Sequence, residues 1–285
     1  MSSTVVSIAV RPLHLHNMAE NLKSNGDATR TELSPAYWLV ESPAVTSQKQ
    51  TAALIILNSP LHDYRYFRTI YDHACFRVCA DGGANRLYKL LCATFDHGPE
   101  SLRAAPPDLI HGDLDSLGDN VRRHYEDIGV EVSKDPDQYS TDFGKCVKKV
   151  LEIKRDVRDV LVLGSLGGRV DQGLGLLHEL YREQTIRHSG VRFWLFSESS
   201  VSTVLRPGTT VINTSVAEGL ITRNIGILPV YGPAVITTEG LEWDVKDWPT
   251  AMGEQVSTSN HIMTDRITIT TDRDVLFTVE HGVGS

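Results

Sequence analysis

Two aspartates separated by one residue follow a short apolar run near the middle of the chain. Asp113 and Asp115 come soon after Leu109-Ile110, and Gly112 allows the backbone to turn just before Asp113. Two carboxylates held this close repel each other unless a cation or a proton lies between them. An Asx-type turn with solvated carboxylates would use the same residues. The pair therefore predicts a metal site only if further ligands lie nearby.

Further acidic residues follow other apolar runs of strand length. Asp81 comes directly after one such run, and Asp142 and Asp171 lie in the segments that follow two others. The carboxyl ends of parallel strands meet at one edge of a sheet, where open α/β folds bind their ligands. Any one of these acids could cap a helix, but a shared site accounts for all of them. Because carboxylate oxygens are the ligands that Mg²⁺ prefers, we expect magnesium at this edge.

Two glycine-rich segments support a phosphate site in the same place. Gly82-Gly83 and the segment from Gly164 to Gly168 each lie between a predicted strand and a predicted helix, where backbone amides attract anions. Arg169 adds a guanidinium group that can pair with phosphate. As an alternative, the glycines could be needed only for the steric requirements of the turns, and Arg169 could be an ordinary solvated side chain. The chain has no Gly-x4-Gly-Lys-Ser/Thr loop, so it is not a P-loop enzyme.

The segments around these candidates predict a parallel sheet. Apolar runs of strand length alternate with segments in which apolar residues recur at helical spacing. This alternation predicts a doubly wound, Rossmann-like α/β domain over residues 36–198. Over residues 199–285 short segments alternate between apolar and polar residues, which predicts an antiparallel β-sandwich. The expected strands of the first domain are 52–57, 76–80, 107–110, 130–132, 159–163 and 191–196.

Composition is that of a globular protein. The chain has 285 residues, of which 41% are hydrophobic and 22% charged. A net charge of -8 leaves no basic face for nucleic acid, and no apolar run approaches the roughly 20 residues that span a membrane. The four cysteines show neither metal-ligand spacing nor a disulfide framework, which predicts reduced thiols and a cytoplasmic location. Residues 1–35 are expected to form a disordered leader, with a mitochondrial transit peptide as the alternative.

Six blocks of this sequence resemble the thiamine pyrophosphokinase family of eukaryotic type. They occur in the order that the family shows, from about residue 53 to the C-terminus. Leu114 and Val170 stand where phenylalanine is expected, and both positions are apolar. The blocks are ADGGANRLY (80–88), HGDLDS (111–116), DQYSTD (137–142) with Lys145-Cys146, GGRVDQ (167–172), GLEW (240–243) and VSTSN (256–260).

The resemblance implies a kinase that transfers a diphosphate group from ATP to the hydroxyl group of thiamine and releases AMP. It implies an ATP-binding α/β domain, a thiamine-binding β-sandwich, and a homodimer with its active sites at the subunit interface. Mg²⁺ would be the cofactor and ATP the co-substrate. Positioning and electrostatics carry most of the catalysis in phosphoryl transfer, so no covalent nucleophile is needed. The expected enzyme is thus a transferase of thiamine diphosphate biosynthesis.

The positions of the acids and the resemblance together predict the site. Asp113, Asp115 and Asp142 are the expected catalytic residues and Mg²⁺ ligands. Trp243 is expected to lie against thiamine in the cleft of the partner subunit, although the local pattern alone favours an ordinary core tryptophan. The other expected contacts to the substrates are Asp81, Asn85, Gln138, Thr141, Gly168, Arg169, Asp171, Gln172, Ser257, Ser259 and Asn260.

Two functions of other classes fit part of the pattern. A metal-dependent nucleotide phosphohydrolase would release inorganic phosphate without thiamine. A non-catalytic sensor of thiamine or nucleotide would bind its ligand and form no AMP. Because every expected acid is present, the sequence favours the diphosphate transfer.

Overall fold

The computed structural model describes residues 30–41, 51–95 and 98–282. Within them, six parallel strands lie in the order β7, β6, β2, β3, β4, β5. The chain therefore moves outward from β2 to β5 and then crosses back to β6 on the other side of β2, as in a doubly wound fold. The six strands are β2 (Ala52–Ile56), β3 (Ala74–Ala80), β4 (Leu109–Gly112), β5 (Glu131–Lys134), β6 (Asp159–Leu163) and β7 (Arg192–Phe196).

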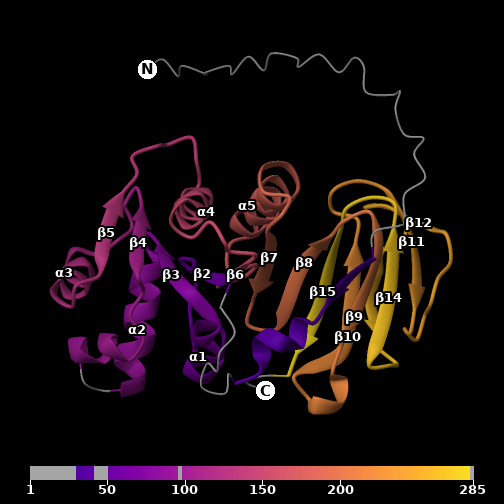
Figure 1. Ribbon diagram of the computed structural model, residues 1–285, viewed down its shortest axis with the longest axis horizontal. Helices are drawn as coiled ribbons and strands as arrows, with labels where there is room; N and C mark the ends of the chain where they lie inside the picture. Colours follow the sequence, from indigo (N-terminus) through magenta and orange to yellow (C-terminus); the bar gives the residue numbers. More distant parts are fainter. Residues whose placement is uncertain (1–29, 42–50, 96–97, 283–285) are drawn as a thin grey trace, which may run out of the picture.

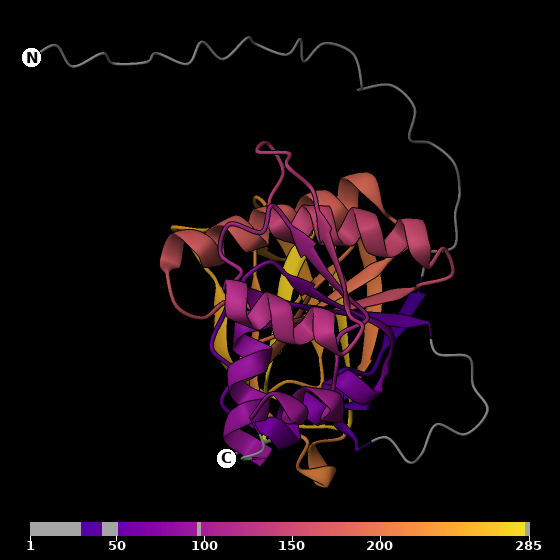
Figure 2. The ribbon, with the colours of Figure 1, turned by 90° about the vertical axis from the view of Figure 1, so that its left-hand side faces the viewer.

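Helices cover both faces of this parallel sheet (Figure 1). Phe67, Leu87 and Tyr125 pack from α1, α2 and α3 against one face, and Val147 and Leu180 pack from α4 and α5 against the other. A view turned by 90° shows the same two layers (Figure 2). The continuous apolar run of β2, at most 3% exposed, is explained by this burial on both faces. The helices are α1 (Tyr64–Asp72), α2 (Gly83–Phe95), α3 (Asp119–Asp127), α4 (Asp142–Ile153) and α5 (Val170–Tyr181).

The large sheet continues into the C-terminal part of the chain. β8 pairs antiparallel with β7, and β15, β10 and β13 follow in the same sheet, which thus has ten strands. A second sheet, in the order β1, β9, β14, β11, β12, packs against this antiparallel part through a shared core. The predicted fold class is confirmed, with one sheet common to both parts. The strands are β8 (Ser200–Leu205), β9 (Gly208–Asn213), β10 (Ile221–Leu228), β11 (Ala234–Glu239), β12 (Trp248–Thr250), β13 (Ser257–His261), β14 (Arg266–Thr271) and β15 (Val275–His281).

Residues 30–35 correct the prediction of a disordered leader over residues 1–35. β1 (Arg30–Leu33) pairs parallel with β9 and buries Leu33. The 3-10 helix η1 (Pro35–Leu39) then buries Trp38, whose ring lies 6.2 Å from that of Trp194. The leader prediction is wrong for residues 30–35, because their apolar side chains gain burial at an otherwise open sheet edge. Residues 1–29 lie outside the described residues.

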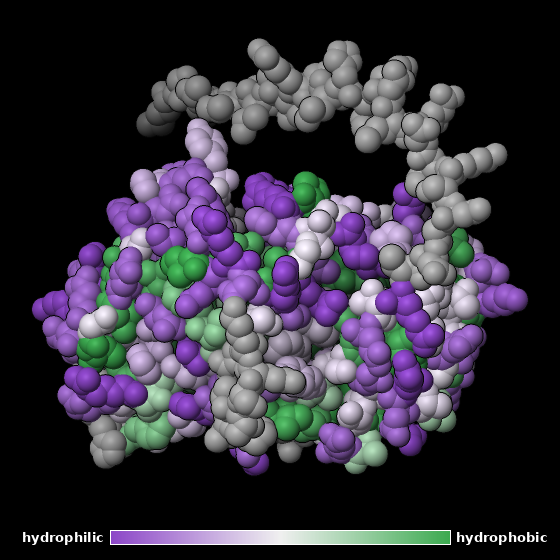
Figure 3. All heavy atoms as spheres, viewed as in Figure 1, coloured by the Kyte–Doolittle hydropathy of each residue, from purple (hydrophilic) through white to green (hydrophobic). Residues whose placement is uncertain are grey.

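Among the described residues, large hydrophobic side chains are exposed at scattered positions. On the face shown in Figure 3, hydrophilic residues predominate and the hydrophobic ones form small separate groups. Val170 and Leu174, one turn apart on α5, are 77% and 63% exposed, and Trp243 is 56% exposed. Among the described helices, none is both long enough and apolar enough to cross a membrane.

Candidate active site

Three carboxylates converge where β3, β4 and α4 meet at the carboxyl edge of the parallel sheet. One oxygen from each of Asp81, Asp113 and Asp142 lies within 4.8 Å of the others. Asp81 follows β3 with a left-handed backbone, at φ 42°. Gly112 ends β4 beside Asp81 and Asp142. A Cβ atom added to it would lie only 2.9 Å from Asp142 Oδ1 and from Asp81 Cβ. Glycine at this position therefore permits the three acids to meet.

Asp115 lies outside this group of three, in contrast to the sequence-based prediction. Leu114 has a left-handed backbone with φ 64°, which turns the chain between the two aspartates. The Asp115 carboxylate is exposed and accepts a hydrogen bond from Ser116 Oγ at 2.9 Å. Its backbone N–H donates to Asp113 Oδ1 at 3.3 Å. The left-handed backbone at Leu114 cannot be predicted from the spacing of the two aspartates.

Lys145 belongs to the cluster and was not among the predicted site residues. Its side chain is 1% exposed, and Nζ lies 3.2 Å from Asp113 Oδ2 and 3.3 Å from Asp142 Oδ1. Lys145 follows Asp142 by three residues in α4, which places both on one side of the helix. That spacing was the signal that could have identified it.

The neighbours of each group explain its ionisation. Burial raises the pKa of Asp81, and the negative charge of Asp142 raises it further. Burial also acts on Asp113, but the hydrogen bonds from Lys145 and from the Asp115 amide outweigh it and hold the pKa of Asp113 below its ordinary value. Burial alone would lower the pKa of Lys145, yet the two carboxylates beside it raise that pKa. Asp113 and Lys145 thus form a charged pair, whereas burial and the nearby Asp142 disfavour the ionised form of Asp81.

One buried oxygen of the cluster has no hydrogen-bond partner. Asp81 Oδ2 accepts from the Ser116 amide at 3.1 Å, but Asp81 Oδ1 is buried without a donor. A buried acceptor left in this state is unfavourable unless a ligand satisfies it. A hard divalent cation with oxygen ligands would satisfy it, so the residues present fit Mg²⁺.

Replacing Asp81 by Asn is expected to stabilise the metal-free protein by about 1–3 kcal/mol, because it removes a buried charge that has no partner on one oxygen. Thermal unfolding followed by circular dichroism in the presence of a chelator measures this. Glu152→Gln, an exposed change on α4, is the matched control. A lower unfolding temperature for the Asp81 variant than for the wild type would show that the Asp81 carboxylate does not destabilise the metal-free protein.

Asp81 and Asp142 line a cleft of about 730 Å³, whereas Asp113 and Asp115 are not among its lining residues. Its lining includes Gly82 and most of the segment from Gly164 to Gly168, and it begins where β2, β3 and β6 end. All residues that line it lie between Leu57 and Glu179, so the C-terminal strands contribute none. The predicted site residues among its lining are Asp81, Thr141, Asp142, Gly168, Arg169, Asp171 and Gln172.

Arg169 reaches the rim of the cleft as part of an ion pair. Its Nε and Nη2 donate to the two carboxylate oxygens of Asp171 at 3.0 Å and 2.6 Å, and both side chains are exposed. The hydrogen bonds from Arg169 lower the pKa of Asp171. Two residues predicted separately therefore form one bidentate unit.

Three other predicted residues differ in what they contact. Asn85 binds the loop after β4, since its side chain donates to Ser116 O at 2.7 Å and accepts from the Gly118 amide at 3.0 Å. Thr141 caps α4 by accepting from the Gly144 amide at 3.1 Å. Gln138 is exposed and does not line the cleft. Asn85 and Thr141 thus hold the loops that carry the acids.

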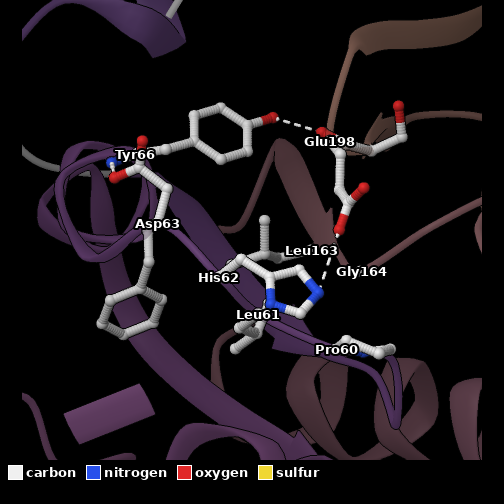
Figure 4. Close-up of a pocket in the computed structure, with 10 residues that line it drawn as sticks. Pro60, Leu61, His62, Asp63, Tyr66, Leu163, Gly164 and Glu198 are labelled. Carbon is white, nitrogen blue, oxygen red and sulfur yellow. Dashed lines mark hydrogen bonds and ion pairs between the residues drawn. The ribbon is translucent and has the colours of Figure 1, made fainter. Parts of the chain in front are cut away.

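A smaller hollow of about 230 Å³ adjoins the cleft and shares Pro60 and Gly164 with it. Figure 4 shows the His62–Glu198 ion pair, at 3.4 Å, across this hollow. Above it, Tyr66 donates to the backbone oxygen of Ser197 at 2.9 Å. The hollow gives the cleft a mainly apolar extension away from the acids.

Trp243 lies in the turn between β11 and β12 and points outward, so the alternative of a core tryptophan is wrong. Asn260, buried in β13, accepts from the Trp243 amide at 3.2 Å and donates to its carbonyl oxygen at 3.0 Å. Both polar groups of Asn260 are therefore occupied in holding this turn. Ser257 is half-buried and Ser259 is exposed, on the same strand.

Comparison with known proteins agrees with this arrangement. A family model described as "Thiamin pyrophosphokinase, catalytic domain" matches residues 67–193, and one described as "Thiamin pyrophosphokinase, vitamin B1 binding domain" matches residues 209–276. A relative from Oryza sativa subsp. japonica named thiamine pyrophosphokinase 1 is 33% identical, over 86% of this chain and 93% of its own length. The chain belongs to the thiamine pyrophosphokinase family.

Other members of the thiamine pyrophosphokinase family extend the likeness to the fold. A relative from Saccharomyces cerevisiae is 29% identical over 82% of this chain and 86% of its own length. The solved yeast thiamin pyrophosphokinase superposes with a TM-score of 0.76 at 27% identity, over 88% of this chain and 91% of that chain. The Candida albicans structure reaches a TM-score of 0.72 at 22% identity, over 90% and 95% of the two chains. The likeness covers both sheets.

Proposed function

We propose that this chain transfers a diphosphate group from ATP to the hydroxyl group of thiamine and releases AMP, with Mg²⁺ as cofactor. The observation that carries the proposal is the cluster of Asp81, Asp113 and Asp142 beside a cleft lined by two glycine-rich segments. The reduced state of the four cysteines, all free, fits the expected cytoplasmic location.

The three carboxylates would hold the magnesium ion. When bound, Mg²⁺ supplies a Lewis acid that draws electron density from phosphate oxygens and neutralises charge in the transition state. Because one carboxylate oxygen each of Asp81, Asp113 and Asp142 lies within 4.8 Å of the others, we assign Asp81 to the metal in place of Asp115.

The remaining lining residues would orient ATP. Leu166, Gly167 and Gly168 line the cleft just before the N-terminus of α5, where backbone amides and the helix dipole would attract the polyphosphate chain. The Gly164 and Ser165 amides donate to Phe196 O at 3.1 Å and would not contribute. Arg86 also lines the cleft, and Asn58 fixes its guanidinium through a hydrogen bond of 2.8 Å. These groups would hold the β-phosphorus in line with the attacking hydroxyl oxygen, which is the main requirement of the transfer.

We further infer that two chains form each complete site. The cleft has no lining from the C-terminal strands, whereas Trp243 is exposed and fixed by Asn260. Val170 and Leu174 are exposed beside the cleft on α5, as expected of residues that a partner subunit covers. Thiamine would then lie between the cleft of one chain and Trp243 of the other, in a homodimer.

Formation of AMP that depends on thiamine tests this function. Purified protein is incubated with ATP and Mg²⁺, with and without thiamine, and AMP and thiamine diphosphate are quantified. The transfer requires equal amounts of both products and no AMP without thiamine. Inorganic phosphate formed without thiamine would indicate a phosphohydrolase instead, and bound ligand without any product would indicate a sensor.

Replacing Arg169 by Ala is expected to raise the Michaelis constant for ATP about five- to tenfold, because an exposed guanidinium adds a modest charge-assisted contact to phosphate. Steady-state kinetics at saturating thiamine measures it. Arg122→Ala, which removes an exposed ion pair on α3, is the control. If both the Michaelis constant and the turnover number stay unchanged, Arg169 is an ordinary surface residue.

A further inference from the structure

Lys145 places a positive charge inside a site that is otherwise built to bind a cation. Its ammonium group is almost fully buried and contacts two of the three clustered carboxylates, Asp113 and Asp142. Burial of an ammonium group is unfavourable unless it is paired, and the two contacts provide the pairing. The side chain therefore competes with a metal ion for the same oxygens.

Hydrogen bonds divide the cluster into two sides. On one side, Lys145 Nζ contacts Asp113 Oδ2 at 3.2 Å and Asp142 Oδ1 at 3.3 Å. The Asp113 amide also donates to Asp142 Oδ1, at 3.4 Å. On the other side, Asp81 Oδ1 is buried without a partner. The oxygen that a cation would satisfy therefore belongs to Asp81, the one acid of the cluster that Lys145 does not contact.

The charges of the cluster match a single divalent ion. Three carboxylates and one ammonium group together carry two negative charges, which one such ion neutralises. Without Lys145, a third negative charge would remain and would draw the ion in more strongly. Asp113 and Asp142 would also lose the group that holds them at a fixed separation.

We propose that Lys145 is a positioning residue that acts as a permanent counter-ion of the acidic cluster. It orients Asp113 and Asp142 before a metal ion arrives, and its charge keeps the affinity for that ion low enough for exchange during turnover. The inference rests on the proposed magnesium-dependent function. An ion bound too strongly in the ground state stabilises no transition state and slows the release of a diphosphate product.

Binding of Mn²⁺ to the nucleotide-free protein tests this role, with the signal of free Mn²⁺ followed by electron paramagnetic resonance. Lys145→Met removes the charge and keeps the length of the side chain. We expect its dissociation constant for Mn²⁺ to fall roughly tenfold or more. The turnover number should fall, and the apparent Michaelis constant for Mg²⁺ should fall with it. Lys148→Met, an exposed change on the same helix, should alter neither quantity.

The outcomes separate this role from a purely structural one. Weaker or unchanged Mn²⁺ binding in folded Lys145→Met would overturn the proposal. If Lys145→Met and Lys145→Gln both lose their native circular dichroism and regain it when Mn²⁺ is added, the counter-ion role is supported. If both stay unfolded with Mn²⁺, Lys145 serves the fold and the proposal is overturned. Failure of the proposed function differs, since the wild type itself would then bind no Mn²⁺ and form no AMP.

Discussion

Replacing Asp113 by Asn is expected to lower the turnover number about 10²- to 10⁴-fold, because it removes a charged ligand of the ion that stabilises the transition state. Asp81→Asn should have a loss of similar size. Both variants should keep their native circular dichroism, since relief of carboxylate repulsion does not unfold a domain. The measurement is the rate of AMP formation at saturating ATP and thiamine, with the Mg²⁺ concentration varied.

Asp115→Asn provides the matched control, since Asp115 belongs to the same loop but lies outside the group of three. As an exposed carboxylate it should contribute no more than about fivefold. If the turnover number fell equally in the Asp113 and Asp115 variants while Asp81→Asn stayed active, the ligands would be Asp113, Asp115 and Asp142, as the sequence predicts. Near-normal activity of Asp113→Asn at limiting Mg²⁺ would exclude the acidic cluster as the metal site.

Replacing Trp243 by Ala is expected to weaken thiamine binding by about 1–2 kcal/mol, or about five- to thirtyfold, through the loss of contact between the indole and a cationic ring. The affinity for ATP should change little, because the cleft lies in the other part of the fold. Thiamine titrations followed by isothermal calorimetry measure the loss. Tyr37→Ala, which removes another exposed aromatic side chain, should have no effect on thiamine binding.

Mixing Trp243→Ala with Asp113→Asn tests whether each site uses two chains. A mixed dimer has one site with an intact acidic cluster and an intact tryptophan, so activity at low thiamine concentration should return when subunits exchange. Exchange is followed independently by native mass spectrometry. No recovery despite proven exchange, or full activity of a monomer, would exclude a shared site.

The strands of the parallel sheet could be predicted because their side chains are apolar and must be buried. The residues of β2 are apolar without interruption, which suits a strand covered on both faces and no surface strand. Continuity of the sheet through β7 and β8 could not be predicted in the same way. The two strands pair antiparallel across a short turn, and the sequence of β8 would suit a strand of either sheet equally well. β1 could not be predicted, because the strand that it pairs with, β9, lies far away in the sequence.

Within the site, the sequence indicated which acids gather but could not resolve their orientation. Asp81 and Asp142 follow different strands, and the prediction that they meet depends only on parallel strands sharing an edge. Which of Asp113 and Asp115 joins them depends on the left-handed backbone at Leu114, a conformation that leucine rarely adopts. Lys145 belongs to a block that resembles the family, but its burial beside the acids could not be predicted, because a lysine in a helix is usually solvated.

The transfer of a diphosphate group as one unit is the central claim, and ATP labelled with ³²P at the γ position tests it most directly. Incubation with thiamine and Mg²⁺ should move the label into thiamine diphosphate, with one unlabelled AMP formed for each labelled product. Label in inorganic phosphate, or in thiamine monophosphate together with ADP, would contradict the transfer.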